Sequence, residues 1–261
     1  MPQTLLRLRS TGTKALIPYI TPEYPVKGST VPVLQALAGA GADMIEVGMP
    51  FSDPLADGKT IQHSSEVALR NGVRLPVILE AVRQFRRSSP IPVILMGYMN
   101  PIFRFGVAKF TEAARDAGVD GLIVADLPPE EAGVLLGASE SAGLSNVFLI
   151  APTTSDERMK WIDRHSTDFS YCVSLTGVTG ARAAFGTNGS LGSFLQRVRA
   201  NTTKPFVVGF GISTAAHVQE VWKHADGAVV GSALIDRLDG AETPDEAAQR
   251  AADFLSSLRA T

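Results

Sequence analysis

The segment Asp43-Met44-Ile45-Glu46-Val47-Gly48 is a short β-type run that places one carboxylic acid among apolar residues. Side chains alternate along a strand, so Glu46 lies on the face opposite to Ile45 and Val47. The Ile/Val face suits a layer of covering helices. The sequence therefore predicts a strand that turns Glu46 away from those helices, toward the interior of the sheet structure.

Seven further runs of this kind are separated by amphipathic segments of helical length. The predicted strands are residues 15–20, 43–48, 91–97, 119–125, 146–151, 168–174, 205–209 and 227–231. The helical segments include 31–40, 107–117, 130–142, 191–200, 214–224 and 244–258. Eight β–α units in this order predict an α/β fold, a single (β/α)8 TIM barrel of parallel strands. An open doubly wound sheet is the structural alternative.

Glycines mark the ends of several helices, in Ala-Gly-Ala at 40–42, Ala-Gly-Val at 117–119 and Ala-Gly-Leu at 142–144. A glycine there can adopt the left-handed conformation that ends a helix. Residues 75–88 predict an extra helix after the second strand, and a short helix is expected at the N-terminus. Because no linker or low-complexity segment interrupts the pattern, we expect residues 1–261 to form one domain.

Composition excludes several classes of function. The 24 basic and 26 acidic residues are mixed along the chain, which does not favour a nucleic-acid or membrane surface. No apolar stretch reaches the roughly 18 residues that span a bilayer. The single cysteine, Cys172, lies in an apolar run and is expected to be a buried packing residue. We therefore expect a cytoplasmic protein.

Acidic residues gather where the second strand ends. The loop Met49-Pro50-Phe51-Ser52-Asp53-Pro54-Leu55-Ala56-Asp57-Gly58 adds two acids to Glu46, which makes three carboxylates within twelve residues. Catalytic groups of such barrels lie at the C-terminal ends of strands. Carboxylates in different environments can divide acid and base roles. Glu46 could instead be a structural acid, and the loop acids could serve turns.

Glycine-rich turns follow the last three predicted strands. They are Gly177-Val178-Thr179-Gly180, Gly209-Phe210-Gly211-Ile212 and Val230-Gly231-Ser232, where a short helix would begin at Ser232. Glycines let backbone N–H groups approach an anion, and a helix start adds a favourable dipole. These loops predict a phosphate site. The four histidines lack metal-ligand spacing.

The block from Glu46 to Gly58 resembles the signature of the tryptophan synthase alpha chain family. Further similarities occur in family order at Gly97-Tyr98-Met99-Asn100-Pro101, Ala125-Asp126-Leu127-Pro128, Gly177-Val178-Thr179-Gly180 and Gly209-Phe210-Gly211-Ile212. The resemblance covers roughly residues 15–240 and implies retro-aldol cleavage of indole-3-glycerol phosphate, without a metal or organic cofactor.

The resemblance also implies roles for individual residues. Glu46 would be the acid and base, and Asp57 would accept the indole N–H. Tyr19, Ile61, Met96, Tyr171 and Thr179 would bound the substrate, with Thr179 helping to close the loop after strand six over Asp57. Gly180, Gly211, Gly231 and Ser232 would hold the phosphate.

A partner is implied as well, namely a pyridoxal-phosphate beta chain in an alpha2beta2 assembly. The loops that carry Asp53, Pro54 and Pro128 would face it. A stand-alone indole-3-glycerol phosphate lyase, a sister phosphate-binding barrel and a non-catalytic regulatory subunit are the alternatives. A sister synthase would need a strand-end lysine, which the sequence does not place.

Three positions depart from the family's usual pattern. Pro22-Glu23-Tyr24-Pro25 stands where a Gly-Asp-Pro turn is expected, Lys59 stands where proline is frequent, and Leu175 replaces an arginine of some members. All three lie in loops that would surround the site, so they bear on loop closure and partner coupling.

Overall fold

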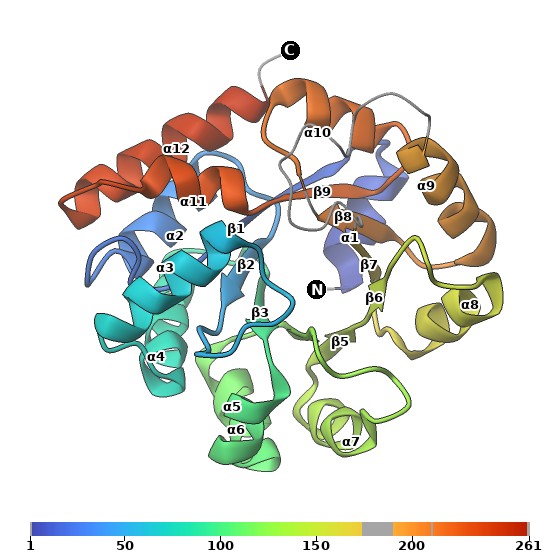
Figure 1. Cartoon of the computed structure of the whole chain (residues 1–261), viewed down its shortest axis with the longest axis horizontal. Helices are drawn as coiled ribbons and strands as arrows, with labels where there is room; N and C mark the ends of the chain where they lie inside the picture. Colours follow the sequence, from blue (N-terminus) through green and yellow to red (C-terminus); the bar gives the residue numbers. More distant parts are fainter. Residues whose placement is uncertain (1, 174–189, 210, 260–261) are drawn as a thin grey trace.

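Parallel strands form a ring at the centre of the molecule (Figure 1). The computed structural model describes residues 2–173, 190–209 and 211–259. The strands follow one another in the order β5-β4-β3-β2-β1-β9-β8-β7-β6, and all neighbours pair in parallel. Their bounds are β1 Ala15–Ile20, β2 Ile45–Gly48, β3 Val93–Gly97, β4 Gly121–Val124, β5 Ser145–Val147, β6 Leu149–Ile150, β7 Ser170–Val173, β8 Phe206–Gly209 and β9 Gly227–Val230.

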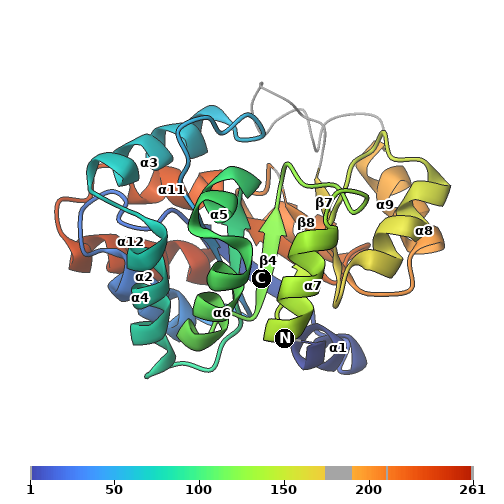
Figure 2. The same ribbon diagram turned by 90° about the horizontal axis from the view of Figure 1, so that it is seen from below.

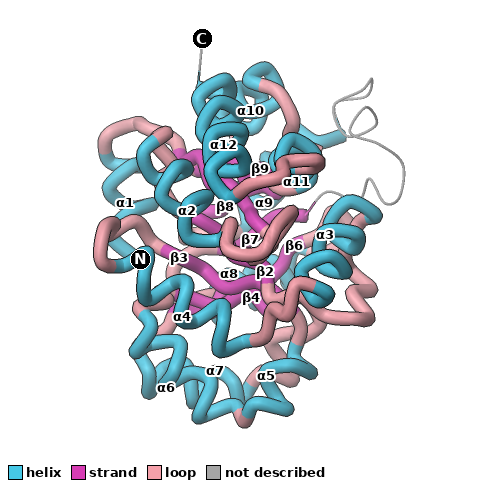
Figure 3. Tube along the Cα trace, turned by 90° about the vertical axis from the view of Figure 1, so that its left-hand side faces the viewer, coloured by secondary structure: helices cyan, strands magenta, loops and turns pink. Residues whose placement is uncertain are grey.

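Helices surround this ring on its outer side, apart from the N-terminal helix, which lies at one end of the barrel (Figures 1 and 3). They are α1 Pro2–Ser10, α2 Thr30–Gly39, α3 Lys59–Arg70, α4 Leu75–Arg86, α5 Met99–Phe105, α6 Val107–Ala117, α7 Gly133–Ala142, α8 Asp156–His165, α9 Ser190–Asn201, α10 Ala215–Trp222, α11 Ser232–Leu238 and α12 Pro244–Arg259. The TIM barrel prediction is confirmed, together with the short N-terminal helix α1 and the extra helix α4 after the second strand. Gly118 and Gly143 end their helices in the left-handed conformation, as expected.

The predicted fifth strand, residues 146–151, is divided into β5 and β6 at Phe148. The N–H of Phe148 bonds to the hydroxyl of Ser166, and the N–H of Asn146 bonds to the hydroxyl of Thr167. Side chains thus replace part of the strand-to-strand ladder. Because Val147 and Leu149 are joined through Phe148, the chain itself closes the ring between the two ends of the strand order.

Two apolar cores lie on opposite sides of the strands. The outer core fills the space between strands and helices and includes Ile45, Val47 and the buried Cys172. The inner core fills the barrel, and the N-terminal helix α1 adds Leu5 and Leu8 to it. Figure 2 shows α1 at one end of the barrel, with α3 and α11 at the other. The end at α1 is therefore filled by apolar side chains, so a site for a substrate is expected at the opposite end.

Carboxylates brace the N-terminal end of the strands. An aspartate that precedes a strand accepts a backbone N–H of the neighbouring strand and pairs with an arginine, which satisfies both the main chain and the buried charge. The three sets are Asp43 with Leu16 and Arg259, Asp120 with Val93 and Arg86, and Asp226 with Phe206 and Arg199. No helix in the described ranges is both long and apolar enough to cross a membrane.

We expect Asp226→Ala to lower the free energy of unfolding by about 2–4 kcal/mol. The Asp226 side chain is 4% exposed, and its removal leaves the guanidinium of Arg199 and the N–H of Phe206 without this partner. Urea denaturation would measure the change. The control is Asp116→Ala, which breaks an exposed pair with Arg115 and should cost less than about 0.5 kcal/mol. Equal effects of the two substitutions would contradict the bracing role.

Candidate active site

Glu46 lies inside the barrel, as its place in the strand pattern predicted. It is 1% exposed and stands in register with Tyr19 on β1 and Ile94 on β3, whose side chains also belong to the interior. Its Oε1 atom is buried and has no hydrogen-bond partner among the described residues. Burial, followed by the charge of Asp57, raises the pKa of Glu46 to about 8. The group is therefore a buried, proton-holding acid at neutral pH.

Asp57 lies at the end of the loop after β2, two residues before α3 begins. Its side chain is half-buried. Burial raises its pKa to about 6, and a hydrogen bond from the Tyr98 hydroxyl acts in the opposite direction. Two carboxyl groups with different affinities for protons thus lie at one end of the barrel, where the charge of Asp57 acts on Glu46. This arrangement can divide acid and base work.

Two tyrosines, Tyr19 on β1 and Tyr171 on β7, pack in the interior of the barrel and act on the same acid, Glu46. A Cβ atom added at Gly48 would overlap with the hydroxyl of Tyr19, and one added at Gly209 would overlap with that of Tyr171. Both glycines therefore leave room for a ring from the neighbouring strand. The charge of Glu46 contributes to raising the pKa of each tyrosine well above its ordinary value, although burial is the larger cause. The tyrosines are consequently neutral, amphipathic walls around the acid.

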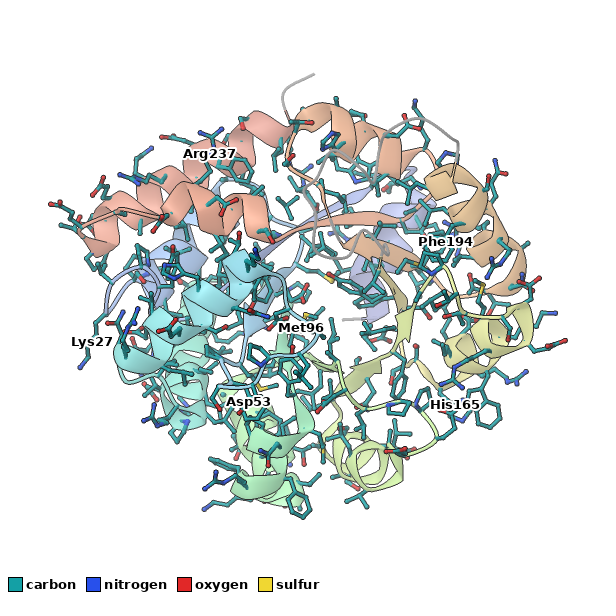
Figure 4. All side chains as sticks on the ribbon, viewed as in Figure 1. Lys27, Asp53, Met96, His165, Phe194 and Arg237 are labelled. Atoms are coloured by element: carbon teal, nitrogen blue, oxygen red, sulfur yellow. The ribbon has the colours of Figure 1, made fainter. Side chains whose placement is uncertain are left out.

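A small pocket opens beside these groups at the C-terminal end of the strands. Its lining residues are Tyr19, Met49, Asp57, Ser65, Met96, Gly97, Tyr98 and Ala125. Met96 lies near the centre of the ring, whereas Asp53 lies farther out (Figure 4). The structure thus brings together Tyr19, Asp57 and Met96. Ile61 packs against the outer core, so its place in the pocket stays a prediction.

Sequence reasoning missed Tyr98 and Ser65. Tyr98 was part of a quoted motif without a role, and Ser65 carried no signal because serine is ordinary on a helix. Both are buried, and the Tyr98 hydroxyl accepts the N–H of Ala56 at 3.0 Å. Only the position of Tyr98, directly after a barrel strand, could have indicated that it belongs to the site.

The structure describes only some of the glycine turns that were predicted to bind phosphate. Gly231 follows β9 and precedes α11, which begins at Ser232 as predicted. A Cβ at Gly231 would lie 3.6 Å from that of Tyr19, so this turn adjoins the same mouth. Gly211 adopts a left-handed φ of 71°. Thr179 and Gly180, together with the departing Leu175, lie outside the described residues.

The departing turn at residues 22–25 is held by its own hydrogen bonds. Glu23 has a left-handed φ of 59°, and its carboxylate accepts the N–H of Gly28 and the hydroxyl of Thr30. Asn71, after α3, donates to the carbonyl of Glu23. Lys59 is exposed at the first position of α3. Neither departure removes a group from the pocket.

Residues 5–260 match the profile of the tryptophan synthase alpha chain family. The chain is 49% identical to the tryptophan synthase alpha chain of Chlorobium luteolum, over 97% of this chain and 96% of that one. The tryptophan synthase subunit alpha of Legionella pneumophila superposes with a TM-score of 0.89 at 39% identity, covering 98% of this chain and 95% of that one.

A solved structure of the tryptophan synthase complex from Pyrococcus furiosus also contains a similar chain. It superposes with a TM-score of 0.85 at 40% identity, covering 94% of this chain and 97% of that one. The match extends over the whole barrel, including the strand that bears Glu46 and the loop that bears Asp57. The chain therefore belongs to the tryptophan synthase alpha chain family.

Proposed function

We propose that this chain cleaves indole-3-glycerol phosphate to indole and glyceraldehyde-3-phosphate by a retro-aldol reaction. The observation that carries the proposal is Glu46, a buried acid with an unbonded oxygen, set beside Asp57 at the open end of a barrel. Cleavage of the carbon–carbon bond needs a proton on indole carbon 3, stabilisation of positive charge at the ring nitrogen, and removal of the side-chain hydroxyl proton.

Glu46 supplies the first and last of these in the proposed reaction. Its pKa of about 8 keeps it protonated at neutral pH, so it can give a proton to indole carbon 3. The carbon–carbon bond then breaks, and its electron pair returns to the indole ring. The resulting carboxylate takes the proton of the side-chain hydroxyl as that oxygen becomes the aldehyde carbonyl. Glu46 ends the cycle protonated again.

Asp57 stabilises the positive charge that develops on the ring. With a pKa of about 6, it is ionised at neutral pH while Glu46 still holds its proton. A carboxylate in this partly enclosed pocket would accept the indole N–H and attract the charge that protonation of carbon 3 creates. The indole would lie between Tyr19, Met96 and Tyr171, with Ile61 beyond them on α3.

The phosphate would lie against the glycine turns. Gly211, Gly231 and Ser232 offer backbone N–H groups at the same end of the barrel as Glu46, and Gly180 would join them. Tyr19 adjoins Gly231, so one residue would touch both the ring and the phosphate end of the substrate. Thr179 would help close the neighbouring loop over Asp57 and exclude water.

A pyridoxal-phosphate beta chain is the proposed partner, in an alpha2beta2 assembly. Asp53 and Pro54 share the loop that ends in Asp57, and Pro128 lies in the loop after β4. Leu55, in the same loop as Asp53, is 95% exposed, and Phe103, on α5 after β3, is 70% exposed. An apolar contact made by the Asp57 loop would let a partner act directly on the catalytic carboxylate.

Indole release from indole-3-glycerol phosphate tests the proposal. Glu46→Gln and Asp57→Asn should each lower kcat by roughly 10²–10⁴-fold, because each removes a positioned acid, base or charge. Glu66→Gln and Asp116→Asn, which change exposed carboxylates outside the pocket, should leave kcat unaltered. Near-normal turnover by Glu46→Gln would refute the acid–base assignment.

The same assay with added beta chain separates the alternatives. Activity that rises sharply with the partner supports a synthase subunit. Strong turnover that the partner does not change would identify a stand-alone lyase. Absence of turnover with or without the partner would leave a regulatory subunit.

Stability against pH tests the state of Glu46 without an assay of activity. Because the folded pKa is raised from 4.5 to about 8, the unfolded chain releases this proton at a lower pH than the folded chain, so stability falls as pH rises between these values. Glu46→Gln cannot ionise, so it should be more stable than the parent chain at pH 8 by at least about 1 kcal/mol. The difference should shrink toward pH 5. Thermal denaturation at both pH values would measure it, and a destabilised variant at pH 8 would contradict the account.

A further inference from the structure

We propose that Tyr98 is a positioning residue that holds the Asp57 carboxyl in its working orientation. The inference rests on the proposed function and adds a group to which neither the sequence motifs nor the family resemblance gave a role. Tyr98 is 5% exposed and directly follows β3, whereas Asp57 belongs to the loop after β2.

The Tyr98 hydroxyl reaches that loop directly. It accepts the N–H of Ala56 at 3.0 Å and lines the same pocket as Asp57, to whose carboxyl we infer that it donates a hydrogen bond. A phenol oxygen that accepts from one residue and donates to the next fixes both the main chain and the side chain at this point. The bond to Tyr98 would occupy part of the Asp57 carboxyl and leave the rest of it for the indole N–H.

The ring of Tyr98 is itself held firmly. Phe51, at the start of the same loop, packs on it with ring centroids 5.6 Å apart. The next residue, Met99, begins α5 and donates its N–H to Asp126 at 2.8 Å. Tyr98 contacts the Asp57 loop, and Met99, the residue after it, ties the same stretch of chain to the loop after β4. A rigid anchor of this kind is what a catalytic side chain on a loop requires.

The protonation of both groups agrees with this direction of donation. Burial, and then the charge of Asp57, raise the pKa of Tyr98 far above its ordinary value, so the phenol keeps its proton. Other titratable groups near this pair are Glu46 on β2, Tyr19 on β1 and Asp126 after β4, with Lys59 exposed on α3. Tyr98→Phe changes none of them.

The test is the pH dependence of indole release by Tyr98→Phe. Without the donated bond the Asp57 carboxylate is less stable, so it ionises at higher pH. We expect the acidic limb of kcat to move upward by about one pH unit, with a loss of about five-fold near pH 6 that becomes smaller toward neutrality. An unchanged profile, or a loss that is equal at all pH values, would overturn the proposal.

Tyr24→Phe is the matched control. It removes another buried tyrosine hydroxyl bonded to a carboxylate, that of Asp239 at 2.9 Å, outside the pocket. The acidic limb of kcat for Tyr24→Phe should lie at the same pH as that of the parent chain. A shift equal to that of Tyr98→Phe would overturn the proposal.

A second variant covers the case in which Tyr98→Phe does not fold. Site-specific 3,5-difluorotyrosine at position 98 keeps the ring and hydroxyl but makes the phenol a stronger donor. It should move the acidic limb downward, and an unmoved limb would count against the inference. If the parent chain releases no indole at all, the proposed function fails instead, so the two failures are distinguishable.

Discussion

A carboxyl group enclosed by the strands of a barrel can be accommodated in few ways. It must find a hydrogen-bonding partner, pair with a cation or keep its proton. Glu46 has no cation beside it in the described part of the chain, and one of its oxygens is unbonded. It therefore keeps its proton to an unusually high pH. Burial in the barrel interior and the charge of the nearby Asp57 both favour the protonated form of Glu46.

The two ends of the barrel treat carboxylates in opposite ways. At the N-terminal end, Asp43, Asp120 and Asp226 each have an arginine and a backbone N–H, so their charges are satisfied. At the C-terminal end, Glu46 and Asp57 have no such arginine among the residues that the structure describes, and both have raised pKa values. Paired acids stabilise the fold, whereas unpaired acids retain reactivity, so stability and chemistry are separated along the barrel axis.

Local pattern was sufficient for much of the fold. The alternation in β2 predicted that Glu46 points inward, and β1 and α6 have the predicted bounds. The division of the fifth strand at Phe148 was not predictable, because it depends on hydroxyls of Ser166 and Thr167 that lie far along the chain. The role of Tyr98 was missed for the same reason. Its hydroxyl bonds to the N–H of Ala56 in another loop, and neither the spacing nor the composition of the sequence predicts such a contact.

The protonation of Glu46 can be observed directly by infrared spectroscopy. The difference spectrum between the parent chain and Glu46→Gln should contain the carbonyl stretch of a protonated carboxylic acid at neutral pH. That band should give way to the carboxylate band with a midpoint near pH 8. A carboxylate band already complete at about pH 6 would mean that the buried acid is ionised and cannot be the proton donor.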